Sequence, residues 1–312
     1  MSNSLKEDCE IIKAFNNNIV LVKAEGKEKM LFQIGIGFSK RPGDKVYKGT
    51  EIEKVFIIED EDNIRNFKTL ISSLDEGFIG FCEELIYFIS KELNEELSEN
   101  IHVGLIDHLF FAIKRLKNEE EIQNPFIVEI ETLYNKEFSL AQQVAIKIEK
   151  HLGVYIPDGE AGFIALHIHS ARNNGKLSNT IKYSFISSSI IECIEDTLNI
   201  EIDKRSLDYA RFLTHLRFAI ERIVTNTPIG NDFIDVIKSR YRKSYSIAKY
   251  AAEILKENLD TIDVIEDEIA YLAMHIERFR VSLTKWKRVL QNDFFQSFCQ
   301  HPFCSLKFKC KR

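Results

Sequence analysis

The sequence contains the same pair of helical motifs twice, and this duplication restricts the possible folds more than any other feature. In each copy a first histidine is followed by Phe at +3, Ala at +4 and Arg at +7, and a second histidine is preceded by Glu at −7. The pairs are His108 with His167 and His215 with His275, so the histidines recur after 107 and 108 positions. Offsets of three, four and seven residues lie on one helix face. Because solenoid repeats are only about 20 to 50 residues long, the pattern predicts a duplicated helical domain.

Composition agrees with a helical protein of several domains. The chain has 312 residues, with only 13 Gly and 5 Pro, which favours long helices. No apolar run approaches the roughly 18 residues of a membrane span, and the polar start at residues 1–8 lacks the apolar region of a signal peptide. Six scattered cysteines indicate a reducing compartment, so we expect a cytoplasmic protein without membrane insertion.

The net charge of −6 conceals an uneven distribution. Residues 1–56 hold ten Lys or Arg against eight Asp or Glu, and residues 284–312 hold seven against one. The remaining 57–283 hold 25 against 39. Because an acidic body repels polyanions, a nucleic-acid partner must bind near one end of the chain.

The first sixty residues have the pattern of a small antiparallel sheet. Runs of β-branched and aromatic residues are broken by Asn, Gly and Pro-Gly, which predicts a meander. We expect strands at 11–15, 19–22, 29–33 and 54–58. Such a sheet has a marginal core and is often completed by dimerisation.

Three motifs in this segment resemble the co-antiterminator RNA-binding domain of the BglG-family (β-glucoside/sucrose-type) transcriptional antiterminators. They are Lys13-x-x-Asn16-Asn17-Asn18, Gly35-x-Gly37-Phe38-x-Lys40-Arg41-x-Gly43-Asp44 and Ile52-Glu53-Lys54-Val55-Phe56. The resemblance implies a homodimer that binds a hairpin in the mRNA leader of a sugar-utilisation operon and prevents an overlapping terminator from forming.

The resemblance places RNA contacts on Lys13, Asn18 and Phe38. The chemistry agrees, because Lys neutralises phosphate, Asn recognises a base edge and an aromatic ring stacks on an unpaired base. One departure concerns Gln33-Ile34-Gly35, where the family usually has Gly-(Arg or Lys)-Gly. The missing cation bears on RNA affinity or target sequence.

After an acidic break at 59–63, apolar residues recur at helical spacing to the end of the second repeat. We expect helices at 67–93, at 101–117, from Asn124-Pro125, at 139–152 and from Asp158 or Glu160, then at 180–198, 204–224, 232–259 and 266–281. The predicted fold is therefore multi-domain α+β, with a small N-terminal sheet (1–63) before two duplicated all-α bundles (64–174 and 175–283).

The two bundles resemble the phosphotransferase-system regulation domain (PRD) that follows the RNA-binding domain in the same family. The motifs are Leu-x-Asp-His and Glu-Ala-Gly-Phe-Ile-Ala-Leu-His in the first copy, and Thr-His-Leu-x-Phe and Tyr-Leu-x-Met-His in the second. The resemblance implies phosphorylation of His108, His167, His215 and His275. The implied donors are the histidine phosphocarrier protein and the sugar permease, with opposite effects on the two repeats.

The remaining histidines, and the carboxylate next to His108, have other interpretations. His102, His151 and His169 have no counterparts in the second repeat, so we interpret them as structural or surface residues. Asp107 beside His108 suggests a metal-hydrolase dyad, but adjacent helical residues point to different sides and the second copy has Thr in place of this Asp. No cofactor and no metal are expected.

A histidine-dependent phosphoryl-transfer enzyme would need a glycine-rich phosphate loop, a Walker motif or a metal cluster. A DNA-binding activator would need a helix-turn-helix, whereas the N-terminus has strand patterns. The sequence therefore favours an RNA-binding antiterminator that is not an enzyme.

The basic, Phe-rich tail at 284–312 has no counterpart in the resembled family. Its residues Cys299, His301, Cys304 and Cys310 could ligate zinc, but their spacing fits no strong pattern. Contact with RNA or a membrane surface is a further alternative. We expect a poorly ordered appendage.

Overall fold

A computed structural model describes residues 3–24, 26–173, 177–227, 229–259 and 263–291, with side chains as far as residue 282. Asn174 and Gly175 of the Asn173-Asn174-Gly175 turn expected between the two bundles lie outside the described residues, as do residues 292–312 of the tail predicted at 284–312. Residues 284–291 of that tail are not a separate appendage but continue the last helix, which ends at Gln291. The chain divides into a first unit, residues 1–184, and a second unit, residues 185–312. No helix among the described residues is both long and apolar enough to cross a membrane.

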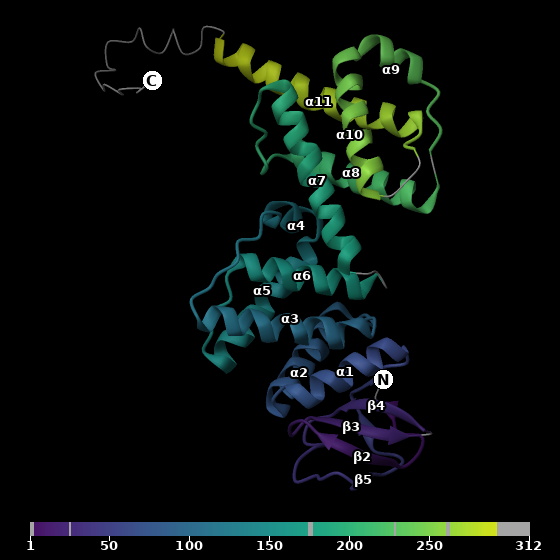
Figure 1. Ribbon diagram of the computed structural model, residues 1–312, viewed down its shortest axis with the longest axis vertical. Helices are drawn as coiled ribbons and strands as arrows, with labels where there is room; N and C mark the ends of the chain where they lie inside the picture. Colours follow the sequence, from purple (N-terminus) through teal and green to yellow (C-terminus); the bar gives the residue numbers. More distant parts are fainter. Residues whose placement is uncertain (1–2, 25, 174–176, 228, 260–262, 292–312) are drawn as a thin grey trace, which may run out of the picture. The chain divides into compact units, whose positions relative to one another are not determined.

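The first unit begins with an antiparallel sheet whose strand order is β5-β2-β3-β4-β7 (Figure 1). Its strands are β2 (Cys9–Ala14), β3 (Ile19–Ala24), β4 (Lys27–Phe32), β5 (Lys45–Val46) and β7 (Lys54–Ile57), and β1 (Asn3–Ser4) pairs separately with β6 (Glu51–Ile52). The four predicted strands correspond to β2, β3, β4 and β7. Strands β1, β5 and β6 were not predicted, because two-residue strands have no periodicity.

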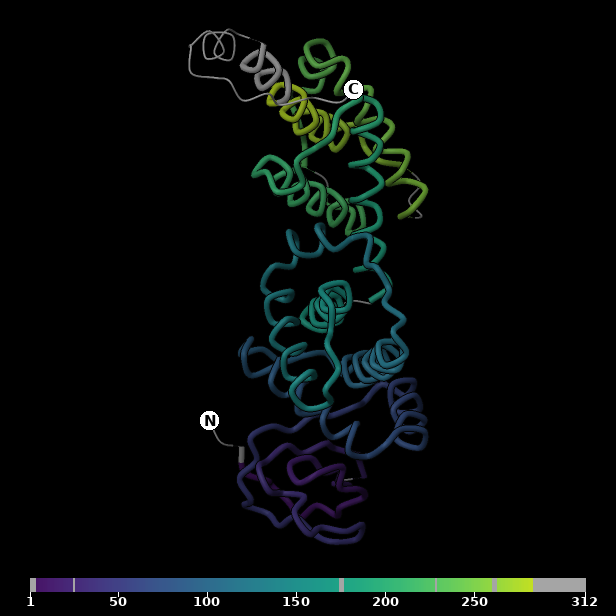
Figure 2. The backbone as a smooth tube through the Cα atoms, turned by 90° about the vertical axis from the view of Figure 1, so that its left-hand side faces the viewer, coloured from purple at the N-terminus to yellow at the C-terminus, as the bar shows by residue number. Residues whose placement is uncertain are grey.

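Both faces of this sheet are buried. Residues 19–22 of β3 are all buried, and alternate side chains of a strand point to opposite faces. On one face Val20, Val22 and Leu31 pack under the sheet's own loops. On the other, Ile19 and Leu21 join a core shared with the helices. Figure 2 shows the purple sheet lying against the blue helical segment that follows it, so helices of the same chain complete this sheet.

Six helices follow in the first unit. They are α1 (Glu61–Ser73), α2 (Glu76–Leu93), α3 (Asn100–Lys117), α4 (Ile127–Leu133), α5 (Asn135–Leu152) and α6 (Asp158–Arg172). The predicted helix at 67–93 is wrong, because it is two helices. Leu74 is extended, and the side chain of Asp75 accepts a hydrogen bond from the Phe78 N–H, which caps a new helix. A two-residue break between amphipathic helices leaves the apolar periodicity almost unchanged.

The second unit repeats this arrangement. Helix α7 (Leu177–Leu198) crosses the boundary between the units and is followed by α8 (Leu207–Thr225), α9 (Ile234–Arg240), α10 (Arg242–Leu259) and α11 (Glu266–Gln291). The predicted helix at 232–259 is likewise two, α9 and α10, with Tyr241 between them. Helices α8 to α11 follow the order of α3 to α6, so the predicted fold of a small sheet before two duplicated helical bundles is confirmed.

Candidate functional sites: two histidine pairs and one edge of the sheet

The first histidine pair joins α3 to α6. His108 and His167 are half-buried, and their ring centroids lie 5.1 Å apart. Gly104, one turn before His108, makes room for this approach, since a Cβ there would lie 3.3 Å from the His167 Nδ1 atom. The sequence offsets therefore bring the two imidazoles together across a helix interface.

The charged residues two turns from each histidine converge on the same place. Glu160 is fully buried on α6, and its Oε1 atom accepts a 2.8 Å hydrogen bond from Arg115 Nη2 on α3. Its other oxygen, Oε2, lies 3.4 Å from His108 Nε2. The first pair therefore faces a buried carboxylate.

Burial keeps these histidines neutral. It lowers the pKa of His108 to about 4, with a further lowering from Arg115. Burial also lowers the pKa of His167 to about 3, with His108 as the second cause. A neutral imidazole has a nitrogen lone pair at pH 7, which a phosphoryl acceptor requires.

The second pair joins α8 to α11. His215 and His275 are stacked, with ring centroids 4.0 Å apart. Arg222 donates two hydrogen bonds of 2.6 Å to Glu268, so both carboxylate oxygens are occupied. Burial, then His215 and Arg278, lower the pKa of His275 to about 4, and burial followed by the two arginines lowers the pKa of His215.

A tyrosine distinguishes the second pair. The Tyr271 hydroxyl lies 3.1 Å from His215 Nδ1, and the corresponding residue of the first repeat is Phe163. The guanidinium carbon of Arg222 lies 5.0 Å from the centre of the Tyr271 ring. Because the hydroxyl is hydrogen-bonded to Nδ1 of His215, Nε2 is the ring nitrogen that remains to accept a phosphoryl group.

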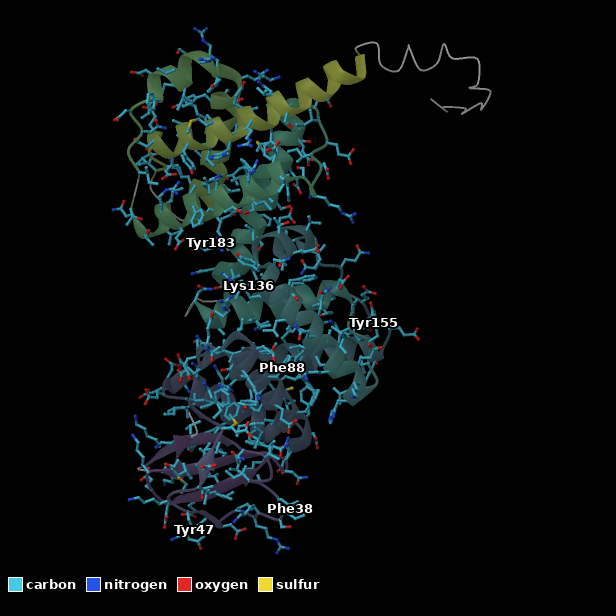
Figure 3. The ribbon with its side chains drawn as sticks, turned by 180° about the vertical axis from the view of Figure 1, so that it is seen from behind. Phe38, Tyr47, Phe88, Lys136, Tyr155 and Tyr183 are labelled. Carbon is cyan, nitrogen blue, oxygen red and sulfur yellow. The ribbon has the colours of Figure 1, made fainter. Side chains whose placement is uncertain are left out.

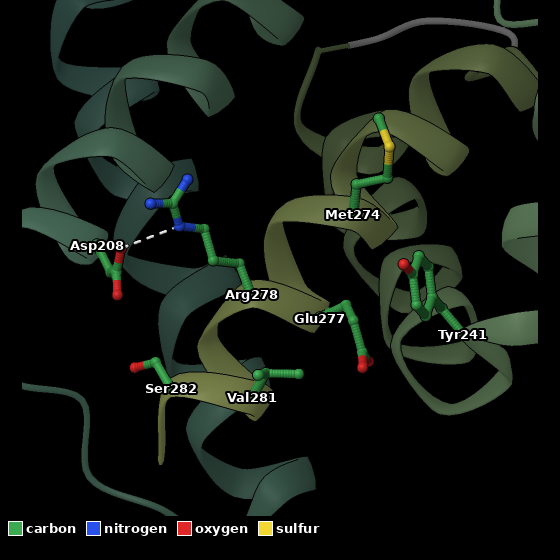
Figure 4. Close-up of a pocket in the computed structure, with 7 residues that line it drawn as sticks. All are labelled: Asp208, Tyr241, Met274, Glu277, Arg278, Val281 and Ser282. Carbon is green, nitrogen blue, oxygen red and sulfur yellow. Dashed lines mark hydrogen bonds and ion pairs between the residues drawn. The ribbon is translucent and has the colours of Figure 1, made fainter. Parts of the chain in front are cut away.

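A groove of about 460 Å³ lies along α11, and Met274, the sequence neighbour of His275, is among its lining residues (Figure 4). Its lining residues are Asp208, Tyr241, Met274, Glu277, Arg278, Val281 and Ser282. Arg278 donates a 3.1 Å hydrogen bond to Asp208 Oδ1 and adds positive charge near both histidines. The first repeat has a buried serine, Ser170, at this position.

The predicted RNA contacts lie around the turn between β2 and β3. The loop that carries Phe38 is fastened to this turn, because the Gly37 N–H donates to Asn17 O at 2.9 Å and the Gly35 N–H donates to Asn18 Oδ1 at 3.0 Å. A Cβ on Gly37 would lie 2.1 Å from Asn16 O, so only glycine fits there.

Two exposed aromatic residues project from the sheet at the end away from the helices. The Phe38 side chain is 68% exposed and Tyr47 is 65% exposed, and Figure 3 shows both at that end of the first unit. Tyr47, which lies in a polar loop, is not among the residues predicted to contact RNA. Ile34 is also exposed, so the departure from the family pattern lies on the surface.

Lys13 and Asn18 contact the first helical bundle. Lys13 Nζ lies 3.0 Å from Glu76 Oε1, and Asn18 Nδ2 donates to Glu84 Oε1 at 2.9 Å. Both glutamates belong to α2. No local pattern in the sequence pointed to these partners.

The three histidines interpreted as structural or surface residues have partners within the first unit: His102 is buried, whereas His151 is exposed. His102 pairs with buried Glu83 at 2.8 Å, and His169 pairs with Glu137 at 2.9 Å. His151 stacks on Phe81. Within the described part of the chain, no group of three or more His, Cys, Asp or Glu side chains could hold a metal ion, and the tail cysteines lie outside it.

Comparison with known proteins gives consistent matches along the chain. Residues 9–65 match the family described as CAT RNA binding domain, and residues 83–171 and 188–279 both match the PRD domain. The chain is 33% identical over 273 residues to the transcription antiterminator LicT of Bacillus subtilis, covering 86% of this chain and 98% of LicT. It is 35% identical over 271 residues to the protein GlcT of Staphylococcus haemolyticus, covering 86% and 95%. A crystal structure of GlcT CAT-PRDI aligns with a TM-score of 0.47 and 39% identity, covering 54% of this chain and 99% of that one.

Proposed function

The chain belongs to the BglG family of transcriptional antiterminators, and we propose that it binds a leader hairpin of a sugar-utilisation operon as a homodimer. It is an RNA-binding regulator of antitermination controlled by phosphorylation from the sugar phosphotransferase system, and its relative LicT is named as a transcription antiterminator. The observation that carries the proposal is the match of one RNA-binding domain and two PRD domains in this order.

RNA binding is assigned to residues 1–63, and regulation to residues 64–174 and 175–283. Within the sheet, Lys13 would neutralise a phosphate, Asn18 would contact a base edge and Phe38 would stack on an unpaired base. Phe38 has a large exposed ring, and its loop is hydrogen-bonded to the turn formed by residues 16–18, here called the Asn turn. Both observations support the assignment. Stacking on an aromatic ring requires no base-specific hydrogen bond, so this contact can accept several different bases.

The four paired histidines are the proposed phosphoryl acceptors, and the donors are the histidine phosphocarrier protein and the sugar permease. Their neutral, half-buried imidazoles support this role. A phosphoryl group adds about −1.5 to −2 charges. We propose that phosphorylation of the first repeat silences the protein and that phosphorylation of the second activates it.

The test uses the full-length chain and a labelled leader hairpin of the adjacent operon, with a scrambled hairpin as control. Lys13→Ala and Phe38→Ala should each weaken binding by about 1–3 kcal/mol, and affinity should fall steeply as salt rises. Lys48→Ala, an exposed lysine, is the control for charge alone. Wild-type affinity in both variants would remove these residues from the RNA surface.

A second measurement concerns the histidines. Mass spectrometry under conditions that preserve phosphohistidine, after incubation with the phosphotransferase proteins, should find label on His108, His167, His215 and His275. Label on His102 or His169 instead would contradict the assignment.

A further inference from the structure

Helix α2 meets the proposed RNA-binding residues with acidic side chains. We propose that this acidic edge of α2, Glu76 and Glu84, is a docking surface for the Asn turn of the sheet and that leader RNA competes with it. The inference rests on the proposed function and concerns the regulation of the same site. It predicts a closed form, with the turn docked on α2, and an open form that binds RNA.

Glu84 contacts the turn twice. Its Oε1 atom accepts a 2.9 Å hydrogen bond from the side-chain amide of Asn16 and another of 2.9 Å from that of Asn18. A carboxylate oxygen that accepts two amide N–H groups makes the same kind of contact as an RNA phosphate or a base acceptor. The Asn18 amide cannot donate this hydrogen to Glu84 and to a base together.

Glu76 meets the cation of the RNA-binding edge. Its Oε1 atom lies 3.0 Å from Lys13 Nζ, which also lies 3.5 Å from Ile71 O. Lys13 is 23% exposed and Glu76 is 58% exposed. Ion pairs at such partly exposed positions contribute little, so a phosphate can displace Glu76 without a large cost.

The backbone of α2 fits the turn closely because of one glycine. A Cβ on Gly80 would lie 2.7 Å from Asn16 Nδ2 and 3.1 Å from Asn16 Cβ. The Asn16 side chain cannot swing aside freely, because its Oδ1 atom accepts hydrogen bonds from the N–H groups of Asn18 and Ile19 at 2.8 and 2.9 Å. Glycine is unfavourable within a helix, and this approach is a physical reason for its presence.

The contact sequesters only part of the RNA-binding surface. Phe38 is 68% exposed, so an RNA can begin to bind through stacking while Lys13 and Asn18 are still docked. The measured affinity is then the intrinsic affinity multiplied by the fraction of open molecules. Helix α2 packs against α3, which carries His108. A change at the first histidine pair can therefore alter the equilibrium between the closed and open forms through this helix contact.

Gly80→Ala tests the proposal without changing charge. The added methyl group should push the turn off α2 and tighten binding of the full-length chain to the leader hairpin about tenfold. Glu84→Ala, which removes the acceptor, should act in the same direction. Gly77→Ala is the matched control on the same helix, since a Cβ there meets only Asp75, and it should change the dissociation constant less than about twofold. Circular dichroism and thermal unfolding establish that each variant is folded.

A reversible lock provides a second measurement. Asn16→Cys combined with Gly80→Cys places the two Cβ atoms 3.1 Å apart, a few tenths of an ångström less than the about 3.5–4.5 Å found in disulfides, so a small outward shift of the turn allows the bridge to form. Oxidation by diamide should close the turn onto α2 and abolish hairpin binding, and dithiothreitol should restore it. Equal binding by the oxidised and reduced forms would overturn the competition.

The outcomes separate this inference from the proposed function. If neither the wild type nor the variants bind the leader hairpin while all are folded, the proposed function fails. If the wild type binds and both Gly80→Ala and Glu84→Ala match it, RNA binding stands and the competition is wrong. Tighter binding by both variants, with Gly77→Ala unchanged, supports the competition.

Discussion

The two histidine pairs have the same sequence motif but different chemical surroundings. In the first repeat, His108 Nε2 lies 3.4 Å from a carboxylate oxygen of Glu160. In the second, both oxygens of Glu268 accept hydrogen bonds from Arg222. The ring nitrogen Nδ1 of His215 is hydrogen-bonded to the Tyr271 hydroxyl instead. The motif therefore determines that histidines pair, whereas the neighbours determine what a phosphoryl group would encounter.

This difference suggests why the proposed effects have opposite signs. A phosphate on His108 Nε2 would face the negative charge of Glu160 and would draw Arg115 away from it, so the contact between α3 and α6 must rearrange. A phosphate on the second pair would find the guanidinium groups of Arg222 and Arg278 nearby. Phosphorylation is thus expected to disrupt the first interface and to be accommodated by the second.

The largest expected effect is on stability. Glu268→Ala leaves Arg222, whose side chain is 14% exposed, without two hydrogen bonds, and should cost about 3–5 kcal/mol. Glu160→Ala removes one hydrogen bond from the more exposed Arg115 and relieves the contact with His108, so it should cost less. Urea unfolding of the full-length variants measures both. Equal losses of unfolding free energy would mean that the two carboxylates are equivalent. A larger loss in Glu160→Ala than in Glu268→Ala would reverse the comparison.

The next effect concerns the direction of the switch. His108→Asp or His167→Asp should lower antitermination, because each places a negative charge in the first repeat. His215→Asp or His275→Asp should raise it. A reporter gene behind the leader should change about tenfold in each direction, with dimer mass measured in parallel. Changes of the same sign in all four variants would rule out opposed control.

The dependence of stability on pH should also separate the repeats. Both first-repeat histidines have folded pKa values far below 6.5, about 4 and about 3. The unfolded chain therefore binds more protons, and stability present above pH 6.5 is lost as pH falls toward 4. Each such histidine contributes about 1.4 kcal/mol per pH unit within this window.

His167→Gln should therefore flatten the pH profile of the unfolding free energy between pH 6.5 and 4.5. His275→Gln is the matched variant, because His275 corresponds to His167 in the second repeat. It should flatten the profile less near pH 4.5, since the pKa of His275 is lowered to about 4 and that of His167 to about 3. Urea unfolding at half-unit pH intervals measures the slopes. A larger contribution from His275 than from His167 at pH 4.5 would reverse the comparison.

The smallest expected effect concerns the ring nitrogens. Tyr271→Phe removes the hydroxyl from His215 Nδ1 and should slow phosphorylation of His215 by about threefold, the effect of one neutral hydrogen bond. Phe163→Tyr is the converse variant in the first repeat and is expected to leave phosphorylation of His108 unchanged, since the nitrogen of His108 near a charged group is Nε2. Single-turnover phosphorylation by the phosphocarrier measures both rates. No change in Tyr271→Phe would show that the hydroxyl does not position the ring.

Much of the fold could be predicted from the sequence because its signals are local. The strands β2, β3, β4 and β7 and most of the helices follow apolar periods of 2 and 3.6 residues. The breaks at Asp75 and Tyr241 were missed, because the periodicity continues across them. The complete burial of β3 was also missed, since no local pattern shows that helices cover its second face.

For the sites, the duplication by itself determined that four histidines lie on helix faces with an Arg and a Glu two turns away. Only the tertiary structure decided which atoms meet. The Tyr271 hydroxyl reaches His215 across 56 positions of sequence, and Asn18 reaches Glu84 across 66. Periodicity assigns a side chain to a face of its own element, but the partner on that face comes from the packing of elements distant in sequence. That packing places α2 against the RNA-binding residues. It also brings a Glu160 oxygen close to His108, whereas both oxygens of Glu268 bind Arg222.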